Sequence, residues 1–133
     1  MPKRDDAFRG KSRRQLVAKL DKLFSLYIHR RDALPNGIGR CITCGTITTL
    51  QCGHFIKRQH MAVRWNPLNA AGQCPRCNHF LHGNEGAFCM ALIKKYGQAI
   101  VDELLRLKHT TAKFSRGELI DRILNYQAKL DEL

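Results

Sequence analysis

The sequence predicts one small α+β domain, with helices at both ends and a loop-rich centre that contains short strands. Apolar residues recur at helical spacing before residue 33 and after residue 83, and turn-forming residues interrupt residues 38–82. A chain of 133 residues has room for one hydrophobic core. No uncharged apolar run approaches the roughly 18 residues that a membrane helix needs, so no membrane partner is expected.

Residues 1–11 are polar and predict a basic N-terminal arm. Residues 12–37 predict a basic amphipathic helix that runs from Ser12 to about Asp32 and ends before Pro35-Asn36-Gly37. Basic side chains fill much of its circumference, and its apolar residues keep helical spacing: Leu16, Val17, Leu20, Leu23, Phe24, Tyr27 and Ile28.

Residues 38–97 predict the core, with short strands around Ile47–Leu50 and Gly53–Lys57 and a helix from about Asn84 to Tyr96. Residues 98–133 predict C-terminal helices, one over Gln98–Lys108 and one that starts at a capping box, Ser115-Arg-Gly-Glu118. The apolar stripe of the last helix fits packing on the domain or on a partner chain: Leu119, Ile120, Ile123, Leu124, Gln127 and Leu130.

Cysteine spacing predicts a structural zinc site in this core. The chain has six cysteines, and four form two C-x2-C pairs, Cys41-Ile-Thr-Cys44 and Cys74-Pro-Arg-Cys77, with 29 residues between the pairs. Two such knuckles supply four thiolates for tetrahedral zinc, and a four-thiolate site is closed to catalysis. Cys52 and Cys89 remain, and both are interpreted as buried apolar residues, with Cys52 as an alternative ligand.

The basic charge predicts a polyanionic partner. The net charge is +12, and no acidic residue lies between Asp32 and Glu85. Lys and Arg bind phosphates and release condensed counterions, so nucleic acid is the expected partner and a merely solvated basic surface is the alternative.

Three polar residues between and beside the knuckles form a candidate catalytic set. His54 suits a general base because imidazole titrates near neutral pH. The side-chain oxygen of Asn78 suits Mg²⁺ or Mn²⁺, and Asn69 is placed to hydrogen-bond the backbone and fix the loop that carries His54.

The ordered segments resemble a known family. They are Lys22-Leu-Phe-Ser-Leu-Tyr-Ile-His29, Cys41-Ile-Thr-Cys44-Gly45, Gly53-His54-Phe55, Arg64-Trp65-Asn66 with Asn69, Gln73-Cys74-Pro-Arg-Cys77-Asn78, and Gly83-Asn84. The pattern resembles the zinc-framed HNH (His-Me-finger) nucleases of the HNN branch, and most closely the lambdoid phage NinG/Rap recombination proteins. The match covers about residues 12–97.

The resemblance implies a zinc-framed ββα-metal (His-Me finger) core with an N-terminal basic amphipathic helix and C-terminal helices. It implies a structure-specific DNA endonuclease that cleaves branched recombination intermediates of the Holliday-junction or D-loop type. His54 would be the general base, Asn69 the orienting residue and Asn78 the ligand of the catalytic metal. It also implies a phage protein that acts in the bacterial cytoplasm.

Gly53 departs from the family pattern, in which many enzymes place an Asp ligand directly before the base. The metal is then held by Asn78, waters and substrate phosphate, or a more distant group joins it, such as His82, Asn84 or Glu85. The expected DNA-binding residues are Arg13, Arg14, Lys57, Arg58, Arg64 and Arg76.

Two rival functions remain open at this point. One is a zinc-stabilised DNA-binding module without nuclease activity, and the other is a protein-interaction zinc module. Because branched DNA offers two arms to cut, a homodimer is expected.

Overall fold

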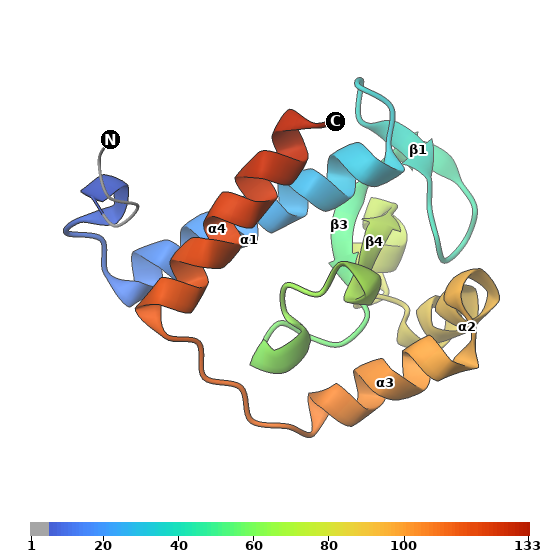
Figure 1. The fold of residues 1–133 in the computed structure, drawn as a ribbon. Coiled ribbons are helices and arrows are strands. Elements are labelled where there is room, and N and C mark those ends of the chain that lie inside the picture. The colour runs from blue at the N-terminus through green and yellow to red at the C-terminus, as the bar shows by residue number, and fades with distance from the viewer. Residues whose placement is uncertain (1–5) are drawn as a thin grey trace.

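The computed structural model describes residues 6–133, so the first five residues of the expected basic arm lie outside the described part (Figure 1). The α-helices are α1 (Arg13–Asp32), α2 (Glu85–Tyr96), α3 (Gln98–Lys108) and α4 (Arg116–Asp131). The strands are β1 (Ile38–Arg40), β2 (Ile47–Thr49), β3 (Gln51–His54) and β4 (Ala70–Gln73). Short helical turns are η1 (Asp6–Phe8), η2 (Met61–Val63), η3 (Pro67–Asn69) and the π-helical η4 (Arg76–Phe80). The α+β prediction is confirmed.

The strands form two separate two-stranded antiparallel sheets, β1–β2 and β3–β4. In the second sheet Gln51 pairs with Gln73 and His54 pairs with Ala70. The expected strand over Gly53–Lys57 is wrong in its position, because β3 ends at His54. The backbone N–H of Ile56 instead donates to the side chain of Asn69 at 2.9 Å, which takes the chain out of the sheet.

Helix α1 begins at a capping box in which Ser12 and Gln15 bond each other's backbone N–H groups. Its buried stripe is Leu16, Leu20, Phe24 and Ile28, at the predicted spacing. Phe8 is also buried against this stripe, so the expected polar arm is packed on the domain at this residue.

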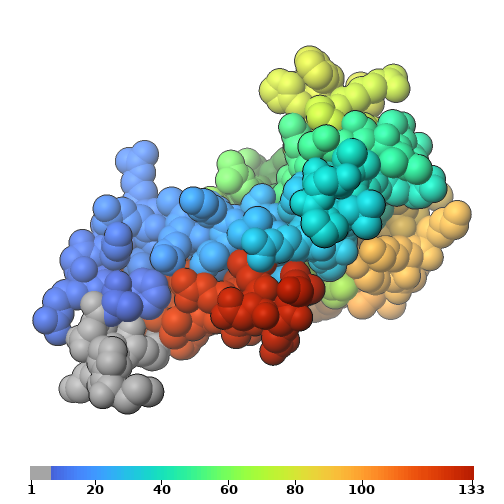
Figure 2. Space-filling view, turned by 90° about the horizontal axis from the view of Figure 1, so that it is seen from above, coloured from blue at the N-terminus to red at the C-terminus, as the bar shows by residue number. Residues whose placement is uncertain are grey.

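Helix α4 lies along α1 in both views (Figures 1 and 2). From the sequence, the apolar stripe of this helix could pack on the domain or on a partner chain. In the structure the stripe is buried within the chain: Leu119, Ile120, Ile123, Tyr126 and Leu130. Leu124, expected in the stripe, is 38% exposed, and Tyr126 is buried instead. The Tyr126 hydroxyl donates to the carbonyl of Trp65 at 2.6 Å and ties α4 to the β3–β4 loop.

The end of α1 holds β4 through a pair of charged residues. Arg31 donates to Asp32 at 2.7 Å and to the carbonyl of Ala70 at 2.8 Å, while Asp32 accepts from the N–H of Gly72 at 2.8 Å. Burial alone would raise the pKa of Asp32, but the bonds from Arg31 and Gly72 lower it below its usual value. These contacts fix the position of β4 relative to α1.

Helices α2 and α3 pack together and enclose a second apolar cluster, which includes Phe55, Val63, Phe88 and Leu92. This cluster supports the β3–β4 loop from the side opposite α1. None of the helices in residues 6–133 combines the length and the apolar character needed to cross a membrane.

Gly53 has no room for a side chain, and we expect Gly53→Ala to destabilise the protein. A Cβ at this position would lie 1.9 Å from Oε1 of Gln73, and Gln73 is fully buried, so its side chain has little freedom to move away. The expected loss is about 1–3 kcal/mol in the free energy of unfolding, measured by urea denaturation.

Gly86→Ala is the matched control, because nothing lies within 4 Å of its added Cβ in α2. It is expected to be neutral or slightly stabilising. Equal stability of Gly53→Ala and the unmodified protein would contradict the close packing described here.

Candidate functional site

The four cysteines of the two C-x2-C pairs meet in the structure. The Sγ atoms of Cys41, Cys44, Cys74 and Cys77 all lie within 4.8 Å of one another, and those of Cys44 and Cys74 are 3.7 Å apart. Tetrahedral zinc with Zn–S bonds of about 2.3 Å separates its sulfurs by about 3.8 Å. The donor set and its spacing therefore fit zinc, as the sequence predicts.

Hydrogen bonds from the surrounding residues support this four-sulfur cluster. Thr43 Oγ1 lies 3.0 Å from the Sγ atom of Cys41, and the side-chain amide of Asn84 donates to the Sγ atom of Cys77 at 3.6 Å. Donors of this kind orient the ligands of a metal and offset thiolate charge.

The two remaining cysteines lie outside the cluster. Cys52 lies on β3 and packs against the α1–α4 apolar cluster, where burial raises the pKa of its thiol to about 11, and Cys89 packs against the α2–α3 apolar cluster. Both residues pack as apolar side chains, but both are half-buried and not fully buried as the sequence predicts.

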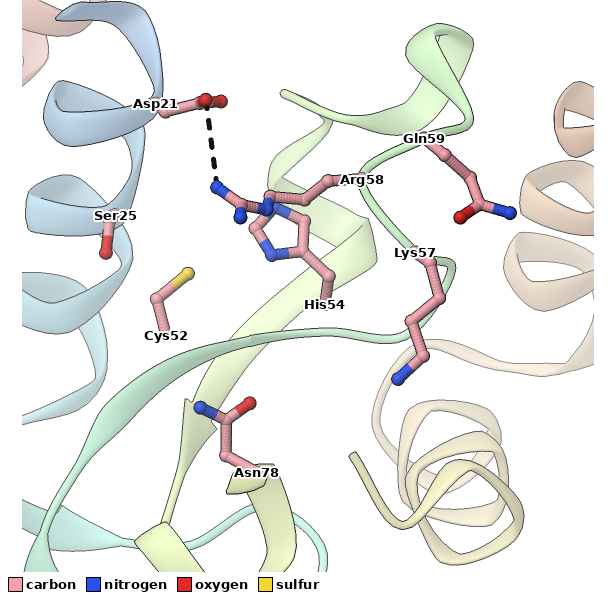
Figure 3. Close-up of a pocket in the computed structure, with 8 residues that line it drawn as sticks. All are labelled: Asp21, Ser25, Cys52, His54, Lys57, Arg58, Gln59 and Asn78. Carbon is pink, nitrogen blue, oxygen red and sulfur yellow. Dashed lines mark ion pairs between the residues drawn. The ribbon is translucent and has the colours of Figure 1, made fainter. Parts of the chain in front are cut away.

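A pocket of about 510 Å³ opens between α1, β3 and η4 (Figure 3). It brings together two of the three predicted catalytic residues, His54 and Asn78, and two of the expected DNA-binding residues, Lys57 and Arg58. Its other lining residues are Asp21, Ser25, Cys52 and Gln59.

The ring of His54 is held in one orientation. Its Nε2 atom lies 3.0 Å from the carbonyl oxygen of Arg64. Because a carbonyl oxygen can only accept, Nε2 carries the proton and Nδ1 of the neutral ring keeps its lone pair. In Figure 3 the ring nitrogen on the Asn78 side faces the open space of the pocket.

Burial lowers the pKa of His54 below its usual value, although the bond to the Arg64 carbonyl acts in the opposite direction. The neutral imidazole is therefore the form present at neutral pH. A neutral ring with a free Nδ1 is able to take a proton from water.

Asn69 is fully buried and does not line the pocket. Its Oδ1 accepts from the N–H of Ile56 at 2.9 Å, and its Nδ2 donates to the carbonyls of Ile56 and Val63 at 3.0 and 3.2 Å. It therefore ties together two parts of the loop that follows His54. Sequence reasoning expected a backbone contact of this kind from Asn69.

Asp21 is a site residue that sequence reasoning missed. Its carboxylate accepts from Arg64 at 2.6 and 2.9 Å and from the indole N–H of Trp65 at 2.9 Å. Burial opposes ionisation, but these bonds lower the pKa of Asp21 below its usual value. Asp21 thus fixes the residue whose carbonyl orients His54.

A sequence signal for Asp21 did exist. It is the single acidic residue of α1 before Asp32, and it directly follows the buried Leu20. An acidic side chain at the border of an apolar stripe, in a helix otherwise rich in Lys and Arg, points to a specific cationic partner.

The expected DNA-binding residues differ in exposure and in the contacts that their side chains already make. Arg64 is 19% exposed in its side chain and is paired with Asp21, so a phosphate contact would have to compete with that pair. The Arg58 side chain is 58% exposed and lies 3.8 Å from Asp21, which leaves it more accessible. Lys57 donates to the carbonyl of His82 at 2.7 Å.

The other expected DNA-binding residues lie away from the pocket lining. Arg14 is exposed on the first turn of α1, and Arg76 is exposed on η4. Arg13 donates to the carbonyl of Phe114, two residues before α4 begins.

Asn78 is oriented by its neighbours. Its Nδ2 donates to the side-chain oxygen of Gln51 at 2.9 Å. The Oδ1 atom of Asn78 takes no part in this bond. Its backbone N–H donates to the carbonyl of Cys74 at 2.9 Å, which ties the main chain of Asn78 to the four-sulfur cluster.

The three residues considered as further metal ligands do not line the pocket. His82 and Glu85 are exposed on the η4–α2 segment, and Asn84 is engaged with Cys77. Across residues 6–133, the four cysteines are the one cluster of three or more Cys, His, Asp or Glu side chains that is spaced to hold a metal. The pocket offers a hard cation the oxygen of Asn78 and space for water and phosphate.

Comparisons with known proteins place the chain beside phage proteins. Residues 3–133 match the family described as "Bacteriophage Lambda NinG protein". The chain is 31% identical over 127 residues to "Protein ninG" of Escherichia phage lambda, covering 92% of this chain and 59% of that protein. The corresponding proteins of Escherichia phage 933W and Salmonella phage P22 are each 30% identical, covering 92% of this chain and 60% of theirs.

The chain therefore spans about three fifths of the length of these relatives. No solved structure matches the chain.

Zinc content should depend on the four clustered cysteines and not on the other two. We expect Cys44→Ser to lose most of its bound zinc, because Cys44 is the exposed ligand and its substitution disturbs little packing. Cys89→Ser is the control and should keep about one zinc per chain. Elemental analysis of both variants checks this, and full zinc content in Cys44→Ser would rule out the four-sulfur site.

The imidazole of His54 should titrate below pH 6.5, since burial disfavours its charged form. NMR titration of the His54 ring resonances measures its pKa directly, and His54→Gln assigns the signal. A midpoint at or above pH 6.5 would be inconsistent with the burial of this ring.

Proposed function

The chain belongs to the bacteriophage NinG family, and from this premise we propose that it is a structure-specific DNA endonuclease dependent on Mg²⁺ or Mn²⁺. Its substrates would be branched recombination intermediates of the Holliday-junction or D-loop type. One observation carries the proposal: an oriented, neutral His54 and the side-chain oxygen of Asn78 share one pocket with Lys57 and Arg58. The names of the relatives state no activity, so the proposed chemistry is supported by the site itself.

The order of elements around the pocket supports a ββα-metal core. Strand β3 ends at His54, a loop returns to the antiparallel β4, and η4 follows with Asn78. This strand–loop–strand–helix order resembles that of the HNH nucleases. The four-sulfur cluster holds the β4–η4 end of the unit, as a zinc frame would.

In the proposed reaction, His54 Nδ1 removes a proton from a water molecule that attacks the scissile phosphate. Nε2 stays bonded to the Arg64 carbonyl, so the ring does not turn as it becomes charged. The exposed Arg58 and Lys57 stabilise the negative charge that develops on the phosphate oxygens. A divalent cation bound at Asn78 Oδ1 would polarise the phosphate and stabilise the leaving oxygen.

Gly53 limits how that cation is held. An Asp side chain at position 53 would collide with the buried Gln73, so this chain has no space for the ligand that many HNH enzymes place there. The cation would be bound by Asn78, waters and the phosphate. Mg²⁺ tolerates such a site because it keeps several waters in its coordination shell.

DNA is the proposed partner because basic residues extend from the pocket along two directions. Arg76 lies on η4 beside Asn78, and Arg14 lies about 10 Å from Asp21 along α1 at 1.5 Å per residue. As a protein of a phage family, it would act in the cytoplasm of the infected bacterium. A homodimer would cut both arms of a branch, and its interface would lie outside the α4 stripe, which is buried on α1.

One observation favours a second candidate, a zinc-stabilised DNA-binding module without chemistry. Among residues 6–133, Asp21 is the one carboxylate that lines the pocket, and it is already engaged by Arg64 and Trp65. A pocket without a free carboxylate binds a divalent cation weakly before DNA arrives. The two functions differ in whether DNA is cut.

We expect the unmodified protein to nick an end-labelled four-way junction near the branch when Mg²⁺ is present. Loss of a general base typically costs 10²–10⁴-fold in rate, so His54→Ala should be slower by about that factor. His109→Ala is the control, because His109 is an exposed residue at the end of α3. Unchanged cleavage by His54→Ala would disprove the proposed base, and binding without cleavage in any divalent metal would favour the second candidate.

Asn78→Ala and Asn78→Asp separate a ligand role from a structural one. Asn78→Ala should reduce cleavage and raise the Mg²⁺ concentration needed, while Asn78→Asp keeps an oxygen ligand and should retain more activity. Zinc content equal to that of the unmodified protein shows that each variant is folded. Equal Mg²⁺ dependence in all three proteins would remove Asn78 from the metal site.

A further inference from the structure

The end of η4 and the residue after it carry two large apolar side chains into solvent. Phe80 is 72% exposed and Leu81 is 42% exposed, although the buried Cys77 lies only three residues before Phe80. The segment that contains them projects from the body of the molecule in the view from above, where it is drawn in yellow (Figure 2). An exposed phenylalanine on a projection is unusual for a surface that has no binding partner.

This projection is held firmly. The N–H of Leu81 donates to the carbonyl of Arg76 at 2.8 Å, and the N–H of Gly83 donates to the carbonyl of Cys77 at 2.8 Å. The ring of Phe80 contacts His79 edge to face, with 5.1 Å between ring centroids. The backbone that presents the exposed apolar surface is therefore fixed, which lowers the entropy cost of binding.

Side chains of the pocket region anchor the far end of the same segment. Lys57 donates to the carbonyl of His82, and Gln73 donates to the carbonyl of Gly83 at 2.8 Å. His82 has a backbone φ of 51°, a left-handed conformation that a non-glycine residue adopts only when its surroundings impose it. The projection is thus tied directly to the residues around His54.

The projection begins beside the pocket. Lys57, which lines the pocket, donates to the carbonyl of His82 at 2.7 Å. Phe80 lies two residues beyond Asn78 on η4, so the two side chains leave this helix on different faces. DNA bound in the pocket would reach Phe80 and Leu81 where its next nucleotides pass over η4.

The charge around the projection fits a nucleic acid. Arg76, His79 and His82 are exposed on the same segment, and no acidic residue occurs between Asp32 and Glu85. Many proteins bind the DNA backbone with basic residues and contact the base faces with an apolar or aromatic side chain on the same surface.

We propose that Phe80 and Leu81 form a wedge that contacts base faces at the branch point of the DNA bound in the pocket, with Phe80 stacking on a base. This inference rests on the proposed function, from which it takes branched DNA as the partner. It goes further because it assigns the residues that distinguish branched from linear DNA. In a linear duplex both faces of each base are covered by neighbouring base pairs. At a branch, stacking is interrupted and a base face is open to an aromatic ring.

The test uses a four-way junction with 2-aminopurine at the branch, and a linear duplex of the same sequence, in buffer without chelator and without added Mg²⁺ or Mn²⁺, so that the zinc stays bound and no cleavage occurs. The unmodified protein should raise the 2-aminopurine fluorescence as the branch base leaves its neighbours. Phe80→Ala should lose at least half of this rise and bind the junction roughly fivefold or more weakly, the lower range for one base–aromatic stack. Its affinity for the linear duplex should stay within about twofold.

Met90→Ala is the matched control, because Met90 is 67% exposed on α2 and does not belong to the projection. It should behave as the unmodified protein does. Zinc content confirms that each variant keeps the frame beneath η4.

The outcomes separate the wedge from the nuclease. A fluorescence rise and junction preference that depend on Phe80, in a protein that cuts no DNA in Mg²⁺ or Mn²⁺, would support the wedge and overturn the proposed activity. Cleavage that depends on His54, with equal fluorescence and junction affinity in Phe80→Ala, would overturn the wedge alone. The absence of any junction preference in the unmodified protein would overturn the wedge as well.

Discussion

The buried side chain of Asn69 is the contact on which the geometry of the pocket depends. The loop of residues 55–69 leaves the sheet after His54 and returns to it at Ala70, and the Asn69 amide bonds its backbone at Ile56 and Val63. Removing this amide would leave buried backbone groups without partners, which is costly. The Arg64 carbonyl, and with it the ring of His54, would then lose its fixed place.

Two other contacts complete the frame around this loop. Asp21 holds Arg64 and Trp65 from α1, and the four-sulfur cluster holds η4 with Asn78 from the other side. Each supports a different residue of the pocket, so His54 and Asn78 are positioned independently and face the same space. A domain this small gains rigidity from buried polar contacts that its apolar core alone does not supply, and zinc held by the four cysteines would add to it.

Much of this structure follows from local signals in the sequence, and the rest depends on tertiary contacts. Capping boxes and apolar spacing predict α1 and α4, and the cysteine spacing predicts the four-sulfur cluster. Strand β4 is not predictable in this way, because Ala70–Gln73 contains no β-branched or aromatic residue. Small residues are needed there, since a Cβ on Gly72 would lie 2.7 Å from Leu50. The role of Asp21 depends on how α1 meets the loop, and the exposure of Phe80 runs against its apolar character.

Anomalous diffraction from crystals of the His54→Ala variant, bound to a four-way junction with Mn²⁺, tests the central claim most directly. The proposed site predicts a manganese peak at about 2.0–2.3 Å from Asn78 Oδ1 and in contact with a backbone phosphate near the branch. The zinc frame would give a separate peak among the four sulfurs. A phosphate bound in the pocket with no manganese beside Asn78, or DNA bound on another face of the protein, would contradict the assignment of this pocket as a nuclease centre.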